Sequence, residues 1–162
     1  MNYCVFRSDL MFGTDNRAGL VSCRVYDNDE TTQIEVQNGT IVELKGFEEG
    51  QREVYKAVLA TASSKLENCV VIGSVETMYD ERKHNLDEFV NEKGVICRGY
   101  RLHVNDLFSI TEPGIDGDMP TVGAEVGIGE KGKIKSGATG LGTCEYIELA
   151  GRYTYYTIKV AG

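Results

Sequence analysis

Much of the chain alternates between hydrophobic and polar residues with a period of two, the pattern of a strand with one buried face. The alternation is clearest near the C-terminus, where Tyr156, Ile158 and Val160 share one face. Residues 68–75 (NCVVIGSV) are instead continuously apolar, which predicts a short strand buried on both faces. Short strands with turn signals between them predict a mainly β fold, a small antiparallel β-barrel or sandwich.

Two turn signals divide the first half of the chain. Asn38-Gly39 separates residues 34–36 from residues 41–44, and this dipeptide predicts a tight hairpin because both turn positions take positive φ. GFEEGQ marks a second turn, and residues 52–61 follow as a third hydrophobic run. The composition of this run also allows a helix, but the hairpin context favours a strand.

One segment has a helical pattern. Asn85 lies three residues before Glu88, which is the spacing of a capping box at the start of a helix. Three apolar residues follow on one face at helical spacing: Leu86, Phe89 and Val90. Lys93 and Gly94 supply a cation in the last turn and a left-handed exit. The pattern predicts one short α-helix over residues 85–93.

After this helix the period returns to two, and we predict a long strand-like segment over residues 96–110. One face of it carries Tyr100, Leu102 and Val104, and the other carries Arg101, His103 and Asn105. Farther on, residues 121–144 carry a glycine every few positions, which is typical of short strands that bend round a small barrel.

Residues 1–32 are the least regular part, and we divide the chain into an N-terminal arm or extension (1–32) and a β-rich domain (33–162). Val21, Cys23 and Val25 alternate with polar residues, so this part is either an ordinary first strand with loose flanks or an arm that orders against a partner. The apolar residues that would support the arm are Phe6, Leu10, Met11 and Phe12.

Composition narrows the classes of function. A hydrophobic content of 41% and a charged content of 26% predict one folded soluble domain. The net charge of −8 disfavours nucleic acid as a partner, because binding phosphate requires cations. The five cysteines lack CxxC spacing, which predicts buried thiols in a reducing cell. We expect neither a secretory signal nor a membrane span, and therefore synthesis in a cytoplasm.

No arrangement of residues predicts a catalytic, cofactor or metal site. His84 lies among the carboxylates of the predicted helix entry, and a metal would require three or four converging ligands. The IDGD sequence in residues 112–120 lacks the ligand series and closing glutamate of a calcium loop. The densest aromatic cluster is Tyr153, Tyr155 and Tyr156 beside Arg152. Tyrosine and arginine are enriched at the centres of protein interfaces, although packing in the core explains such tyrosines equally well.

Three segments resemble one known family. They are residues 38–57 (NGTIVELKGFEEGQREVYKA), 77–111 (TMYDERKHNLDEFVNEKGVICRGYRLHVNDLFSIT) and 150–160 (AGRYTYYTIKV), somewhat under half of the chain. The family consists of small proteins of tailed bacteriophages and prophages that are encoded beside the major capsid gene. We identify it with capsid decoration, or auxiliary head, proteins.

The resemblance implies a virion structural protein without enzymatic activity. Such a protein binds the major capsid protein on the outside of the head, needs no cofactor, and often forms homo-oligomers, with trimers favoured. For the contacts with the shell we predict the arm, the segment 98–105 and the tyrosine cluster. The predicted contact residues are Phe6, Leu10, Met11, Phe12, Arg98, Arg101, His103, Arg152, Tyr153 and Tyr155.

Two other functions remain open from the sequence. One is a tail or head-surface module that binds a host receptor or glycan, with residues 153–156 as an aromatic platform. The other, which we rank last, is a hydrolase that uses His103 or Asp106.

Overall fold

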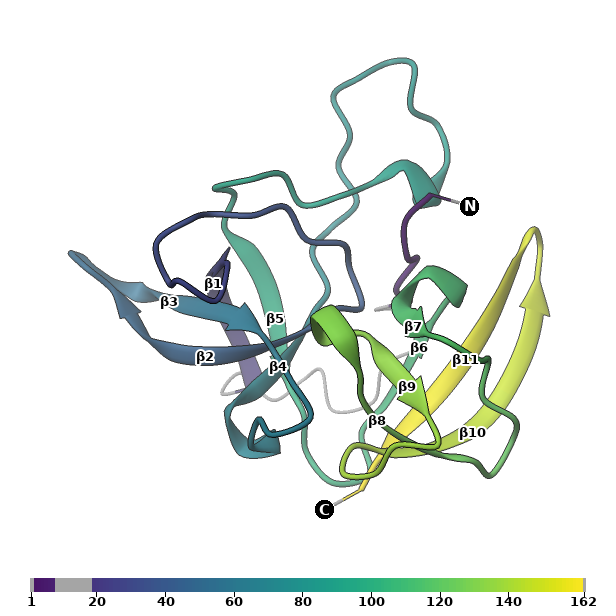
Figure 1. Cartoon of the computed structure of the whole chain (residues 1–162). Coiled ribbons are helices and arrows are strands. Elements are labelled where there is room, and N and C mark those ends of the chain that lie inside the picture. Colours follow the sequence, from purple (N-terminus) through teal and green to yellow (C-terminus); the bar gives the residue numbers. More distant parts are fainter. Residues whose placement is uncertain (1, 8–18, 162) are drawn as a thin grey trace.

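The computed structural model describes residues 2–7 and 19–161. It confirms the mainly β fold: 45% of the residues lie in strands and 9% in short helical turns. The strands form a closed barrel and a second sheet, which lie side by side in Figure 1. The pairing is largely antiparallel, but β1 and β3 run parallel, as do β7 and β9.

The closed barrel has the strand order β1-β3-β2-β4-β5, and β1 closes it by pairing with β5. Its strands are β1 (Leu20–Tyr26), β2 (Ile41–Glu48), β3 (Gln51–Leu59), β4 (Cys69–Ile72) and β5 (Cys97–Arg101). The prediction of a strand over residues 52–61 is therefore confirmed. The turn in GFEEGQ joins β2 to β3 as an antiparallel hairpin.

The interior of the barrel is narrow and apolar. Cys23, Val42, Val70 and Ile72 are among the buried residues of its core. Gly99 of β5 fits this interior because it has no side chain: a Cβ there would lie 2.8 Å from a methyl carbon of Val70. With so little space inside, packing of side chains rather than a cavity holds the barrel together.

The second sheet has the strand order β6-β11-β10-β8-β9-β7. Its strands are β6 (Leu107–Ile110), β7 (Ile115–Asp116), β8 (Glu125–Ile128), β9 (Ile134–Ser136), β10 (Gly142–Ala150) and β11 (Tyr153–Val160). Four short 3₁₀ turns connect strands in the described part of the chain. They are η3 (Leu66–Asn68), η4 (Leu86–Glu88), η5 (Glu112–Gly114) and η6 (Glu130–Gly132).

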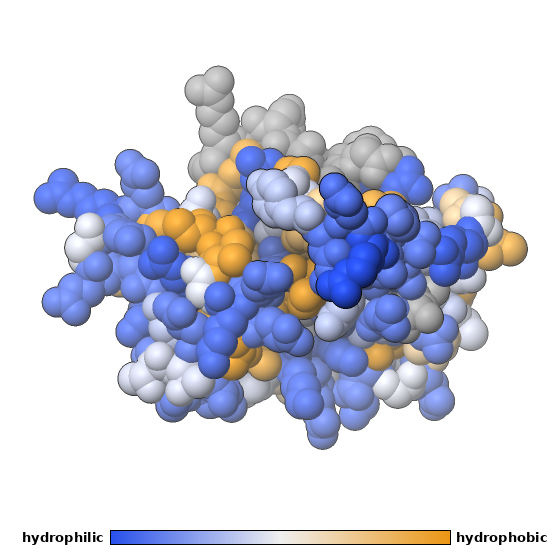
Figure 2. All heavy atoms as spheres, turned by 90° about the horizontal axis from the view of Figure 1, so that it is seen from above, coloured by the Kyte–Doolittle hydropathy of each residue, from blue (hydrophilic) through white to orange (hydrophobic). Residues whose placement is uncertain are grey.

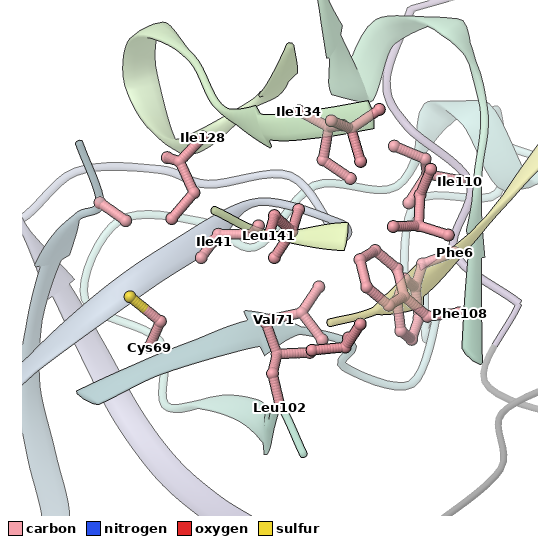
Figure 3. Packing of buried hydrophobic residues seen from close by; sticks show 14 of the residues in the cluster. Phe6, Ile41, Cys69, Val71, Leu102, Phe108, Ile110, Ile128, Ile134 and Leu141 are labelled. Carbon is pink, nitrogen blue, oxygen red and sulfur yellow. The ribbon is translucent and has the colours of Figure 1, made fainter. Parts of the chain in front are cut away.

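The largest hydrophobic core lies between the barrel and the second sheet. Ile41 and Val71 of the barrel meet Phe108 and Ile134 of the second sheet there (Figure 3). The side chains of β4 point alternately into two hydrophobic cores, which explains why its sequence is continuously apolar. Val70 and Ile72 face the barrel interior, whereas Cys69 and Val71 face the second sheet, so the prediction of a strand buried on both faces is confirmed.

The predicted α-helix over residues 85–93 is wrong. Only Leu86–Glu88 form a 3₁₀ turn, although Glu88 does accept the backbone N–H of Asn85 at 2.9 Å, as the capping pattern predicts. Phe89 is already extended, because Asn91 forms a β-bridge with Val36. Long-range pairing therefore overrides the local helical pattern.

The segment 96–110 is not one strand. β5 ends at Arg101, the chain turns through Asn105 with φ of 73°, and β6 then continues in the other sheet. Tyr100 and Leu102 are buried, whereas Val104, predicted to share their face, lies in the turn and is exposed. This turn is the crossing point of the chain from the barrel to the second sheet.

The prediction of a hairpin at Asn38-Gly39 is also wrong. Val36 pairs with Asn91 rather than with the residues that follow the turn, and β2 begins at Ile41. The side chain of Asn38 is buried and hydrogen-bonded to a distant loop, so its role is tertiary rather than that of a hairpin residue.

The predicted boundary between an N-terminal extension and a β-rich domain at residue 32 does not coincide with the edge of the barrel. β1 pairs with both β3 and β5, so the part of the predicted extension that forms this strand belongs to the β-rich domain. Cys4, Val5 and Phe6 are also buried, and Phe6 bridges Ile110 at the edge of β6.

Candidate interaction surface

Three of the predicted contact residues are buried within the chain. Phe6 is 2% exposed and lies between Tyr100 and Phe108, with ring centroids 6.2 Å from each. Tyr153 and Tyr155 are 7% and 4% exposed and pack with Val5. They stabilise the fold and present little surface for the contacts predicted for them. Leu10, Met11 and Phe12 lie outside the described residues.

The tyrosine cluster has its partners inside the chain. The Tyr153 hydroxyl donates a hydrogen bond to Oδ1 of Asp87 at 3.1 Å, and burial together with this carboxylate raises the pKa of Tyr153. Arg152 stacks over the Tyr153 ring at 5.5 Å and donates to Oδ1 of Asn85 at 2.8 Å. The cluster therefore fastens the 84–88 turn to the β10–β11 hairpin.

The remaining predicted contacts lie at the surface but in different surroundings. The guanidinium of Arg101 lies 5.8 Å from the centre of the Tyr55 ring. His103 lies 3.4 Å from Asp106, whose carboxylate also accepts the His103 backbone N–H at 2.9 Å. The His103–Asp106 pair thus closes the turn between β5 and β6, which accounts for its geometry without catalysis. Arg98 lines a groove.

This groove is one of the hollows on the surface of residues 2–7 and 19–161. Its volume is about 630 Å³, and it lies between the loop that follows β4 and the residues that lead into β5. Its exposed hydrophobic lining residues are Val75, Tyr79, Val95 and Ile96. Its charged lining residues are Asp80, Lys83, Glu88, Glu92 and Arg98. Figure 2 looks down on the side of this loop, where hydrophobic atoms gather among hydrophilic ones.

Buried amides fix the walls of the groove. Asn38 donates to the backbone oxygen of Ser74 at 2.9 Å and accepts the Ser74 N–H at 3.1 Å. The amide of Asn91 donates to Oδ1 of Asn38 at 3.0 Å, and the Arg98 N–H donates to the Ser74 hydroxyl at 3.1 Å. Asn38 and Asn91 are buried, and their hydrogen bonds position the loop at Ser74 beside the start of β5.

Two carboxyl groups on the rim of the groove, Glu88 and Asp80, have a lowered pKa. Glu88 accepts the backbone N–H groups of Asn85 and His84, which lowers the pKa of its carboxyl. Asp80 pairs with Arg82 at 2.9 Å, and this contact lowers the pKa of Asp80. The groove therefore combines exposed apolar side chains with charged side chains of both signs.

The cysteines are free and buried, as predicted. Burial raises the pKa of Cys4, Cys69 and Cys97 to about 11 and that of Cys23 to about 12. Since the thiolate is the nucleophile, these thiols are not activated at neutral pH. Within residues 2–7 and 19–161 there is no group of three or more His, Cys, Asp or Glu able to hold a metal ion.

None of the helices in the described part of the chain is long and apolar enough to cross a membrane. No family model, curated protein or solved structure matches this chain. Sequence reasoning found Arg98 but not the hydrophobic residues around it.

Proposed function

We propose that this protein is a capsid decoration protein of a tailed phage or prophage, which binds the major capsid protein on the outside of the head. The segment 77–111, one of the three that carry the family resemblance, also supplies most of the groove. The observation that carries the proposal is this preformed hydrophobic groove on a β scaffold, because a cement protein needs a rigid surface that fits a repeating lattice.

Charge supports the same assignment. The net charge of −8 favours a basic or mixed partner surface over DNA and suits a position outside the shell. The protonated thiols and the structural role of the His103–Asp106 pair support a role without catalysis. We also propose a homo-oligomer, with a trimer favoured by the family resemblance.

The groove gives a direct test of capsid binding. We expect wild-type protein to pellet with expanded empty heads assembled from the major capsid protein of the same phage, and Val75→Glu to weaken this binding about tenfold or more. Val75 is 67% exposed in the unbound chain, so the substitution leaves the fold intact but places an unpaired carboxylate in the contact. The measurement is cosedimentation over a range of protein concentrations.

Val122→Glu is the matched control, because Val122 is 62% exposed and lies outside the groove. It should pellet like the wild type. Equal weakening of both variants would show that the added charge, rather than the groove, matters. No pelleting of the wild type would remove the capsid assignment. Deletion of residues 1–32 is not a usable test, because it removes β1 from the barrel.

A second function, recognition of a host receptor or glycan, is favoured by a different surface. Phe47 is 57% exposed, and its ring centre lies 4.4 Å from that of Tyr55, beside Arg101. An exposed aromatic ring next to polar groups is a common platform for sugars. In this role Phe47 replaces the cluster at residues 153–156, where Tyr153 and Tyr155 are buried and Tyr156 is partly buried. If this function holds, Phe47→Ala will abolish binding to host cells, measured by fluorescence, and leave capsid pelleting unchanged.

A further inference from the structure

Two cysteines face each other across the pair of strands that closes the barrel. β1 and β5 are antiparallel, and their register places Cys23 directly opposite Cys97. Directly opposed residues on such strands have side chains on the same face of the sheet. Both thiols are buried in the barrel core.

The register is compatible with the Cα separation that a disulfide needs. Opposed residues of an antiparallel pair have Cα atoms about 4.5 to 5.5 Å apart, and disulfides join Cα atoms about 4.4 to 6.8 Å apart. The other thiols have no such partner among the strand registers of the described chain. Cys69 lies opposite Glu43 and Cys144 opposite Ile158, while Cys4 lies outside the named strands.

Cys97 lies beside the groove, although it is only 2% exposed. It is one of the residues that line the groove, next to Ile96 and Arg98. Cys23 is 0% exposed, lies in the same core and does not line the groove. A local opening of the groove wall would therefore bring an oxidant to Cys97 before Cys23.

We propose that Cys23 and Cys97 are a disulfide-forming pair, which links β1 to β5 when the protein meets a small-molecule disulfide such as oxidised glutathione. The Cys97 thiolate attacks one glutathione sulfur and releases the first glutathione. The Cys23 thiolate then attacks the Cys97 sulfur of the mixed disulfide and releases the second. Two protein thiols are oxidised, one glutathione disulfide is reduced, and the two thiol protons leave on the two glutathiones.

The link would lock the barrel at its closing seam. It joins residues far apart in the sequence, so it restricts the unfolded chain strongly and should raise Tm by about 5 to 10 °C. Burial raises the pKa of both thiols, so the reaction should be slow at neutral pH and faster in mild alkali. The proposal is independent of the capsid assignment.

Trypsin gives a direct readout of the link. Native protein is incubated with oxidised glutathione, its remaining thiols are alkylated, and it is digested without reductant. We expect residues 18–24 (AGLVSCR) and 94–98 (GVICR) as one linked peptide that separates on reduction. Cys4, Cys69 and Cys144 should be recovered as alkylated peptides.

Cys69→Ala is the matched control, since it removes a buried thiol without an opposed partner. It should keep both the linked peptide and the rise in Tm, whereas Cys97→Ala should lose both. Scrambled links among all the cysteines would overturn the proposal. So would a stable glutathione adduct on Cys97 without the second step, or complete alkylation of Cys23 and Cys97 in the wild type. These measurements on wild-type protein decide the question even if a variant fails to fold.

Discussion

Gly132→Ala is expected to destabilise the protein by more than about 3 kcal/mol, because it combines a strained backbone with a clash. Gly132 has φ of 69°, which disfavours any residue with a Cβ. An added Cβ would also overlap the carbonyl oxygen of Ile41 and lie 2.9 Å from a methyl carbon of Thr40. That oxygen accepts the N–H of Ala60 at 3.1 Å, so it cannot move without breaking a barrel contact.

The measurement is the urea midpoint and slope, and Gly137→Ala is its matched control. Gly137 has φ of 76° but open space around its Cα. Alanine there should cost only the left-handed strain, about 1 to 2 kcal/mol. Equal losses in the two variants would show that the contact between η6 and β2 is unimportant. A much larger loss for Gly132→Ala would identify it as a junction between the barrel and the second sheet.

The hydrophobic pattern predicted strands correctly where it reflects which faces of a strand are buried. The apolar run at β4 and the alternation of Ile158 and Val160 in β11 both correspond to buried faces of the structure. The sequence does not reveal which strands pair. The parallel pairing of β1 with β3, and the closure of the barrel by β5, depend on residues far apart in the chain.

The predicted helix and hairpin fail for one shared reason. Each pattern contains an asparagine, Asn38 in the hairpin and Asn91 in the helix. The side chain of each makes a long-range hydrogen bond that the local pattern does not show. Asn91 bridges Val36, and its amide bonds the side chain of Asn38. A buried polar network of this kind outweighs local propensities of about 1 kcal/mol or less per residue.

The sequence allowed only part of the candidate surface to be predicted. Tyr153 and Tyr155 have the composition of an interface, but aromatic residues fill cores equally well, and only the structure shows which applies. Conversely, Val75 and Ile96 have no local signal. They come together because Asn38 and Ser74 hold the intervening loop beside β5.

Under reducing conditions the protein is expected to lose stability steeply above about pH 9, mainly because of its buried thiols. Burial raises the pKa of Cys23 from 9.0 to about 12, so the folded state holds this proton more tightly than the unfolded state. The stabilisation is fully present below pH 9.0 and is lost as the pH rises toward 12. For Cys23 alone the loss amounts to at most about 4 kcal/mol. Cys4, Cys69 and Cys97, each raised to about 11, act in the same direction.

Urea unfolding followed by circular dichroism, in the presence of a phosphine reductant, measures this dependence from neutral pH to about pH 11. Cys23→Ala should begin with lower stability at neutral pH, because it leaves a small cavity. Its stability should then fall less steeply with pH, since one titrating thiol is gone. Parallel slopes for the variant and the wild type would show that Cys23 ionises equally easily in both states. The alkaline loss would then have to come from other groups, such as the hydroxyl of Tyr153, whose pKa is also raised.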